Sequence, residues 1–180
     1  RLLGVSLADA AAALETAHGA KGRVEPVPTD GDYSIFIDYA VTPDAIENVL
    51  TTLRGIAPKR LVMLFGAGGD RDRKKRPIMG KLSADIADFV IVTSDNPRTE
   101  DPMSIIEEIL PGVRAGKAPY KVICDRPEAI RWAIDHHEPG DVILLCGKGH
   151  EDYQIIGHEK IHMDEREIVA DYLAERAKRT

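Results

Sequence analysis

Short apolar runs alternate with amphipathic stretches along most of this chain. Runs rich in aliphatic and β-branched residues, typical of buried strands, cover 33–37, 60–65, 89–92, 120–124 and 142–146. Between them, stretches with helical spacing of apolar positions cover 43–53, 77–86, 102–113 and 127–135. Several of these stretches open with proline, which is well tolerated at the first position of a helix. The pattern therefore predicts strands and helices in strict alternation.

Both ends of the chain carry further helical patterns. An Ala-rich stretch at 6–16 predicts a helix with Ser6 as its N-cap, and 164–177 predicts an amphipathic helix capped by Asp164, with Glu167 three residues on. Glycines and prolines in 18–32 predict a linker with a short extended piece at 24–27. We expect residues 1–21 to be the tail of a preceding domain, 22–32 a linker and hinge, and 33–180 the compact C-terminal domain.

Alternation of this kind predicts an α/β fold. Right-handed crossovers would place the strands in a mostly parallel sheet of about six strands, with helices covering both faces. In such open sheets, ligands bind at the carboxyl ends of the strands. The polar segments that follow the apolar runs are therefore the candidate ligand-binding segments.

Composition narrows the class of protein. Apolar residues make up 43% and charged residues 30% of the 180 residues, as in a soluble globular protein. A net charge of −6 argues against nucleic-acid binding. No apolar stretch approaches the ~18 residues of a membrane span, and no signal peptide is recognisable. Cys124 and Cys146 fit no CxxC spacing and are expected to be reduced thiols of a cytoplasmic protein.

Four polar clusters follow predicted strands. They are DYAVTPD at 38–44, GAGGDRDRKKRP at 66–77, DNPR at 95–98 and GKGHEDYQ at 147–154. In the first, an aspartate could accept hydrogen bonds from sugar hydroxyls, while Thr42 and Asp44 favour helix capping. In the second, Arg71 could hold an anion, although mixed charge runs are usually solvated loops. In the fourth, Glu151 could hold an ammonium group.

The DNPR turn combines the most varied chemistry. Arg98 offers a planar fork suited to a carboxylate, and Asn96 can both donate and accept hydrogen bonds. Together with Asp95 they could bind a zwitterionic amino acid. The alternative is an ordinary strand-to-helix turn in which Pro97 sets φ and Asp95 or Asn96 caps backbone donors.

Three familiar ligand motifs are absent. Arg71 occupies the third glycine position of a GxGxxG dinucleotide fingerprint, which argues against a nicotinamide-dependent oxidoreductase. Neither glycine-rich loop has the Gly-Lys-Ser/Thr of a triphosphate loop. His158 and His162 are four residues apart but lack the carboxylate of an HExxH motif, so we expect no metal site there.

The four clusters, in this order, resemble the C-terminal domain of the Mur ligases. The strings that carry the resemblance are DYAxTPDA, GxGGDRDRxKRPxMG, TSDNPRTEDP and GKGHEDYQ, and it extends from about residue 22 to the C-terminus. Within the family, they are most similar to UDP-N-acetylmuramoyl-tripeptide synthetases, which add the third residue of the peptidoglycan stem peptide. The resemblance implies a Rossmann-like C-terminal domain that follows a UDP-binding domain and a central ATPase domain.

The resemblance also implies a reaction. With ATP and Mg²⁺, the carboxylate of the UDP-MurNAc-dipeptide becomes an acyl phosphate, and the amine of the incoming amino acid attacks it, giving an amide, ADP and phosphate. The metal ligands would lie in the missing central domain, so this polypeptide alone is expected to be catalytically silent. Swinging of the C-terminal domain about the hinge at 22–32 would align the reactants and exclude water.

Site residues follow from the matching motifs. By resemblance, Arg71, Asp95, Asn96, Pro97, Arg98, Gly147 and Glu151 hold the incoming amino acid, Arg23 reaches ATP phosphates and Asp38 binds the ribose. The DNPR form resembles ligases that add meso-diaminopimelate, whose distal carboxylate an arginine can pair bidentately. One position departs from the family pattern: Val41 stands where DYAHTP has histidine, which affects the nucleotide side.

Two other interpretations of the sequence remain open. The chain could belong to a lysine-adding ligase of the same family, although those relatives carry a different residue at the arginine position. It could also be a non-catalytic module that binds an amino acid or a nucleotide.

Overall fold

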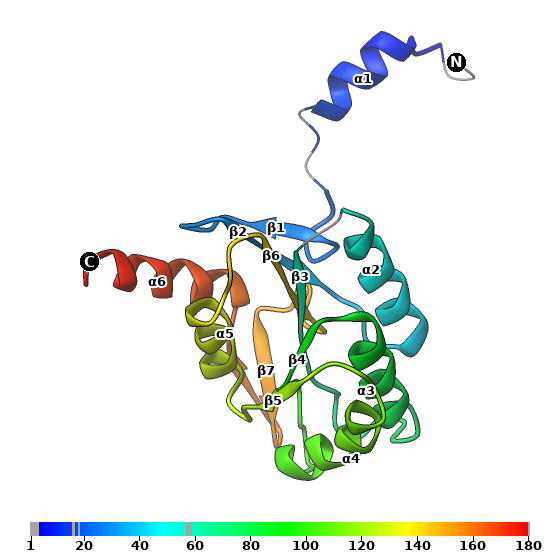
Figure 1. The fold of residues 1–180 in the computed structure, drawn as a ribbon, viewed down its shortest axis with the longest axis vertical. Coiled ribbons are helices and arrows are strands. Elements are labelled where there is room, and N and C mark those ends of the chain that lie inside the picture. The colour runs from blue at the N-terminus through cyan, green and yellow to red at the C-terminus, as the bar shows by residue number, and fades with distance from the viewer. Residues whose placement is uncertain (1–3, 16, 18, 57–58, 180) are drawn as a thin grey trace.

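The computed structural model describes residues 4–15, 17, 19–56 and 59–179. The parts of the predicted tail, linker and C-terminal domain that fall on residues 1–3, 16, 18, 57–58 and 180 lie outside this part of the chain. Between residues 33 and 146, strands and helices alternate along the chain, as Figure 1 shows.

A six-stranded sheet forms the centre of the molecule. Its strands lie in the order β1-β2-β6-β3-β4-β5, and only β1 is antiparallel to its neighbour. The strands are β1 (Glu25–Val27), β2 (Tyr33–Asp38), β3 (Arg60–Phe65), β4 (Phe89–Val92), β5 (Tyr120–Val122) and β6 (Asp141–Cys146). The prediction of a mostly parallel sheet is confirmed. Strands β3 and β6 are central and buried along nearly their whole length, which explains their uninterrupted apolar sequences.

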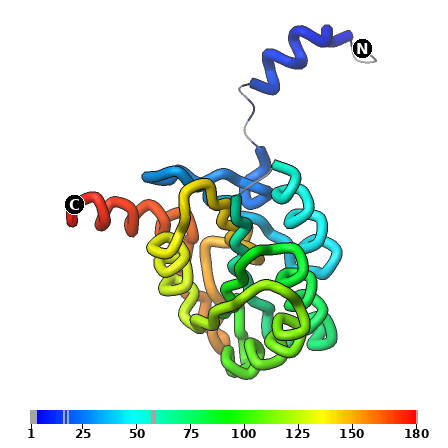
Figure 2. Tube along the Cα trace, viewed as in Figure 1, coloured from blue at the N-terminus to red at the C-terminus, as the bar shows by residue number. Residues whose placement is uncertain are grey.

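Helices cover both faces of the sheet, as predicted. Helices α2 (Pro43–Gly55), α3 (Lys75–Ile86) and α4 (Pro102–Arg114) pack on one face, against side chains such as Leu61, Met63 and Phe65. Helices α5 (Arg126–Asp135) and α6 (Glu165–Ala177) pack on the other face, against Val62 and Leu64 among others. The alternation along β3 follows from the two-residue period of a strand. Figure 2 shows α6 on the opposite side of the molecule from α2 and α3.

Helices α2, α4 and α5 each begin with a side-chain cap, whereas α3 has none. Thr42, Asp101 and Asp125 accept hydrogen bonds from backbone N–H groups in the first turns of α2, α4 and α5, and each is followed by a proline in the first turn. Asp164 caps α6 in the same way, through the Arg166 N–H. The caps of α2, α4 and α5 start these helices directly after the loops at the carboxyl edge of the sheet.

The hairpin of β7 (Tyr153–Ile156) and β8 (Glu159–His162) was not predicted from the sequence. Gly157 turns the chain with φ +61°, and the residues of β8 are exposed. Strand β7 contacts the DNPR turn: Arg98 N–H donates to the Ile155 carbonyl at 3.0 Å, and Gly157 N–H donates to the Arg98 carbonyl at 2.6 Å. The hairpin therefore braces the turn that carries Arg98.

Part of the predicted linker joins the sheet. Glu25–Val27 form its antiparallel edge strand. Arg166 of α6 clamps both carboxylate oxygens of Glu25, at 2.8 and 2.5 Å. Hydrogen bonds from Arg166 outweigh burial and lower the pKa of Glu25 to about 2. The hinge at 22–32 stays a prediction.

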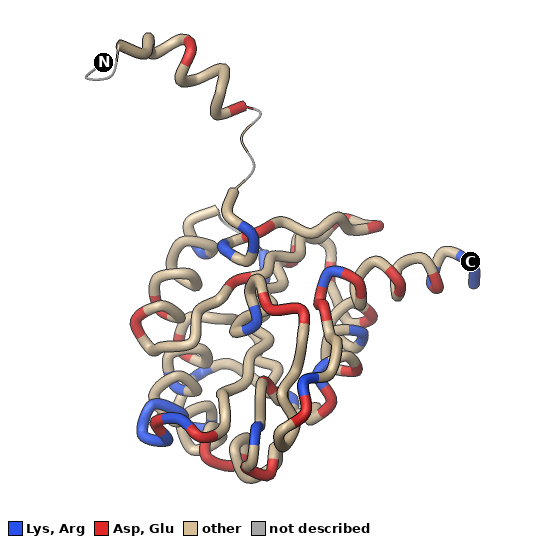
Figure 3. The backbone as a smooth tube through the Cα atoms, turned by 180° about the vertical axis from the view of Figure 1, so that it is seen from behind, with Lys and Arg blue, Asp and Glu red and all other residues tan. Residues whose placement is uncertain are grey.

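Helix α1 (Leu7–Glu15) extends away from the sheet and buries none of its residues (Figure 1). No helix in the described ranges has the length and apolar character needed to cross a membrane. Lysine, arginine, aspartate and glutamate are interspersed along the chain, as Figure 3 shows.

Candidate functional site

Four loops meet at one edge of the sheet because their strands end in register. Asp38, the last residue of β2, pairs with Cys146 at the end of β6. Phe65 at the end of β3 pairs with Cys146 on one side and with Val92, the end of β4, on the other. The polar clusters that follow β2, β3, β4 and β6 are thereby brought together, as the sequence analysis predicted.

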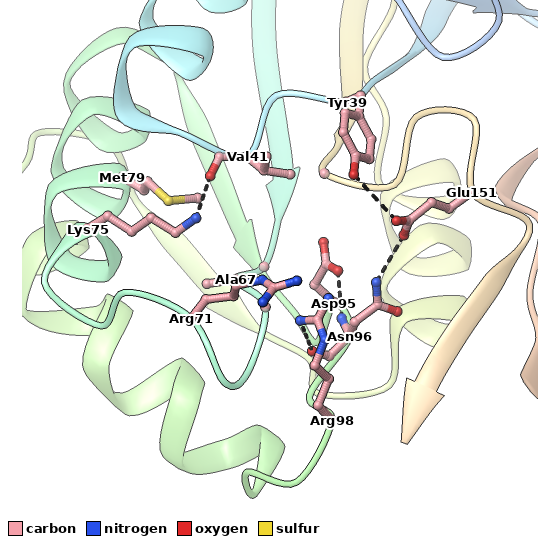
Figure 4. Close-up of a pocket in the computed structure, with 13 residues that line it drawn as sticks. Tyr39, Val41, Ala67, Arg71, Lys75, Met79, Asp95, Asn96, Arg98 and Glu151 are labelled. Carbon is pink, nitrogen blue, oxygen red and sulfur yellow. Dashed lines mark hydrogen bonds between the residues drawn. The ribbon is translucent and has the colours of Figure 1, made fainter. Parts of the chain in front are cut away.

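A pocket with a cavity volume of about 110 Å³ lies between these loops (Figure 4). Six of the residues assigned to the amino-acid site line it. Its lining comprises Tyr39, Val41, Gly66, Ala67, Gly68, Arg71, Lys75, Met79, Asp95, Asn96, Arg98, Gly147 and Glu151.

Arg98 is half-buried and points into this pocket. Its Nη1 donates to the Gly69 carbonyl at 2.8 Å, which anchors one nitrogen and leaves the rest of the planar fork without a carboxylate partner among the described residues. The backbone at Arg98 has φ +53°, a left-handed conformation that costs a non-glycine residue about 1–2 kcal/mol. The contacts with β7 hold this strained turn in place.

Asp95 is buried beneath Gly147. Its Oδ1 accepts the N–H of Asn96 at 2.6 Å, so the carboxylate also shapes the DNPR turn. Gly147 has φ +115°, and a Cβ there would lie 2.6 Å from Asp95 Oδ2. Only glycine allows this close approach of the two loops.

Glu151 is the most heavily hydrogen-bonded carboxylate in the pocket. Its Oε2 accepts from Lys148 Nζ and Asn96 Nδ2, each at 2.9 Å, and its Oε1 lies 3.5 and 3.3 Å from the hydroxyls of Tyr39 and Tyr153. Burial opposes ionisation, but these hydrogen bonds outweigh it and hold the pKa of Glu151 below its ordinary value. Glu151 is therefore a fixed negative charge at neutral pH.

Two further cations complete the lining. Arg71 is exposed at the mouth of the pocket and forms no hydrogen bond or ion pair with another described residue. Lys75, at the start of α3, donates to the Val41 carbonyl at 2.8 Å. The charge run around Arg71 is thus only partly a solvated loop, because Arg76 is fully buried against Glu100 and Glu108.

The other predicted residues lie outside the lining. Pro97 is buried behind the DNPR turn. Arg23 is exposed, with its guanidinium carbon 5.3 Å from the centre of the Tyr39 ring. Asp38 is buried, and its carboxylate accepts the N–H groups of Val24 at 2.9 Å and Ala40 at 2.8 Å. Asp38 thus holds the entry to β1, and its contact with a ribose stays a prediction.

A buried ion pair supports the edge of the sheet below the pocket. Arg126 and Glu165 are both fully buried, with Arg126 Nη2 and Glu165 Oε1 2.8 Å apart. Arg126 also donates to the carbonyl of Cys146 at 2.9 Å, which joins the start of α5 to the end of β6. The thiols of Cys146 and Cys124 are free; Cys146 is buried and Cys124 is half-buried.

Sequence reasoning missed Lys148, Tyr39 and Lys75. Lys148 sits between two glycines in the GKG string, which offered a signal for a turn but none for the burial of its ammonium group. His162 pairs with Glu167 of α6, and no cluster of three or more metal-ligating side chains is found in the described part of the chain.

Residues 22–149 match the family "Mur ligase, glutamate ligase domain". The chain is 54% identical over 158 residues to the UDP-N-acetylmuramoyl-L-alanyl-D-glutamate–2,6-diaminopimelate ligase of Caldanaerobacter subterraneus subsp. tengcongensis, covering 88% of this chain and 33% of that protein. The enzyme of the same name from Trichormus variabilis is 52% identical over 178 residues, with 98% of this chain and 36% of that protein covered.

The fold is also similar to that of a solved relative. A structure of a UDP-N-acetylmuramoyl-L-alanyl-D-glutamate–2,6-diaminopimelate ligase superposes with a TM-score of 0.81 at 37% identity, covering 98% of this chain and 36% of that one. The chain spans about a third of the length of the relatives it matches. It belongs to the Mur ligase family and carries that family's glutamate ligase domain.

Proposed function

We propose that the pocket binds meso-diaminopimelate and that the chain is the C-terminal, amino-acid-binding part of a ligase. That ligase would use ATP to join diaminopimelate to UDP-MurNAc-L-Ala-D-Glu in the cytoplasm, during peptidoglycan synthesis. Relatives that bear this activity in their names, at up to 54% identity, support the assignment.

The observation that carries the proposal is the charge pattern of the pocket. Arg71 and Arg98 face it without carboxylate partners among the described residues, and Asp95 and Glu151 face it as carboxylates. Diaminopimelate carries two carboxylates and two ammonium groups, so each of its charges can meet one of opposite sign. Lysine has one carboxylate fewer and would leave one arginine unpaired.

The roles proposed for the side chains follow from their positions. Arg98, anchored by Gly69, would grip the distal carboxylate, and Arg71 at the mouth would hold the other. Asn96 and Glu151 would hold the reacting end of the amino acid, with Asp95, Pro97 and Gly147 shaping that end of the pocket. Such fixed binding presents the amine in one orientation, and closure over the pocket would exclude water from the acyl phosphate.

ATP would supply the phosphoryl group that activates the acceptor carboxylate. The exposed guanidinium of Arg23 fits a phosphate contact, whereas Asp38 already accepts two backbone N–H groups. The Mg²⁺ that accompanies ATP would be held by residues of the central domain and not by the described residues.

Calorimetric titration of the chain with meso-diaminopimelate and with L-lysine tests the proposal. We expect saturable binding of diaminopimelate. Lysine should bind more weakly by roughly tenfold or more, because it would leave one pocket arginine without a carboxylate partner. Equal affinity would contradict the proposed selectivity, and tighter binding of lysine would favour a lysine-adding ligase. Binding of neither, with the fold intact, would contradict an amino-acid site here.

A further inference from the structure

Lys148 is fully buried beneath the pocket, although it lies in an exposed-looking glycine-rich string. Gly147 and Gly149 flank it with φ +115° and +53°, and this pair of left-handed residues turns the lysine side chain inward. Lys148 does not line the pocket, so it is not placed to contact a ligand.

The ammonium group of Lys148 contacts two pocket residues. Its Nζ donates to Asn96 Oδ1 at 2.8 Å and to Glu151 Oε2 at 2.9 Å, and lies 5.2 Å from the centre of the Tyr153 ring. Lys148 therefore joins the loop after β6 to the loop after β4.

This contact sets the orientation of the Asn96 amide. Lys148 and the backbone N–H of Ile155 approach Asn96 from one side, at 2.8 and 2.9 Å, and both are donors. The carbonyl oxygen of the amide must face them, because an NH₂ group cannot accept. The NH₂ group is thereby directed to Glu151 Oε2 at 2.9 Å.

The same contact divides the two oxygens of Glu151. Oε2 takes two donors at 2.9 Å, from Lys148 and Asn96. Among the described residues, Oε1 has only the two phenol hydroxyls as partners, at 3.3 and 3.5 Å, which are long for O–H···O hydrogen bonds. Oε1 is therefore the oxygen with capacity left for a cation.

We infer that Lys148 is a positioning residue that fixes Asn96 and Glu151 so that Glu151 Oε1 faces the ammonium group of the incoming amino acid. The inference deepens the proposed function and rests on it. Lys148 itself touches no ligand; it acts through the residues that do.

Glu151 shares its pocket with four other charged side chains in the described part of the chain: Arg71, Lys75, Asp95 and Arg98. Lys148 and the hydroxyls of Tyr39 and Tyr153 contact it directly. The ring of His150 lies 4.9 Å from that of Tyr39, which also lies under Arg23. Lys148 is the only cation with a hydrogen bond to Glu151 among these groups, so its removal should act on Glu151 first.

The first test needs no ligand. The pKa of the Glu151 side-chain carboxyl is followed by ¹³C NMR in the 180-residue chain and in Lys148→Met, with Lys81→Met as the control. Lys81 is exposed and pairs with Asp85 on α3. We expect the pKa of Glu151 to rise in Lys148→Met and to stay unchanged in the control. An unchanged pKa in Lys148→Met overturns the inference.

The second test is a double-variant cycle on diaminopimelate binding. Lys148→Met should weaken binding by roughly tenfold or more, because a buried charge loses its partner. In a Glu151→Gln background the same change should cost about twofold or less, since coupled residues do not act independently. Equal losses in both backgrounds would show that Lys148 does not act through Glu151.

Folding defects are distinguished in the same cycle. If Lys148→Met does not fold, Lys148→Met/Glu151→Gln should recover the fold because both buried charges are removed. Failure of the double variant, with Glu151→Gln folded, would contradict the pairing. Absence of diaminopimelate binding by the unaltered chain would overturn the proposed function, whereas the ligand-free titration would still decide the role of Lys148.

Discussion

Replacement of Arg98 by alanine should remove the preference for diaminopimelate. Arg98 is half-buried, one of its nitrogens is held 2.8 Å from the Gly69 carbonyl, and it has no carboxylate partner in the described structure. In the proposed complex, Arg98→Ala would leave the distal carboxylate of the ligand unpaired. Loss of one partner of a buried charged pair costs about 2–5 kcal/mol.

The partial exposure of Arg98 places the expected loss at the lower end of this range. About 2 kcal/mol corresponds to roughly thirtyfold weaker binding of diaminopimelate. Binding of lysine should change little, because lysine has no distal carboxylate. Calorimetric titration of both amino acids against the unaltered chain and the variant measures the two losses separately.

Arg114→Ala is the matched control. Arg114 is an exposed arginine at the end of α4, where it donates to the Tyr120 hydroxyl and not to a pocket residue. Its removal should leave both affinities unchanged. Equal weakening of diaminopimelate and lysine in Arg98→Ala, or no weakening of either, would refute the assigned role of Arg98.

Three further outcomes are expected from the structure. Gly147→Ala should lower the free energy of unfolding by about 1–3 kcal/mol in urea titrations, because of its left-handed φ and the 2.6 Å contact of the added Cβ, while Gly55→Ala, with no atom within 4 Å, should have little effect. The pKa of Glu25 is lowered to about 2, so its pair with Arg166 stabilises the fold above the ordinary pKa of 4.5, and this contribution is lost as pH falls towards 2; Glu25→Gln should flatten that acid dependence, and an unchanged slope would contradict it. Arg126→Met should cost about 3–5 kcal/mol of stability by leaving a buried carboxylate unpaired, and a loss below about 1 kcal/mol would show that the pair is unimportant.

The alternation of strands and helices was predictable because the sequence patterns are strong. Buried parallel strands such as β3 and β6 have uninterrupted apolar sequences, and Pro43, Pro102 and Pro127 mark helix starts next to side-chain caps. The meeting of the four loops was also predictable, since parallel strands end at a common edge of the sheet.

The hairpin β7–β8 was missed because its sequence is mixed and largely exposed. A two-residue turn at Gly157 and His158 separates its strands, and this glycine was the available signal. The four-residue spacing of His158 and His162 suggested a possible pair of metal ligands and gave no indication of a strand. The left-handed backbone of Arg98 depends on this hairpin, so it could not be read from the DNPR string alone.

The burial of charged side chains was the other feature that the sequence did not predict. Lys148 and Arg126 are fully buried, and nothing in their local sequence distinguishes them from exposed cations. Their positions depend on partners distant in the sequence, such as Asn96 for Lys148 and Glu165 for Arg126. Tertiary contacts of this kind appear only once the loops are assembled.

The most direct measurement of the central claim is the Nε–Hε cross-peak of Arg98 in an NMR titration of the chain. Saturating meso-diaminopimelate should shift and sharpen this resonance as the guanidinium gains a carboxylate, and L-lysine should leave it unchanged. Bound diaminopimelate with an unperturbed Arg98 resonance would contradict the account.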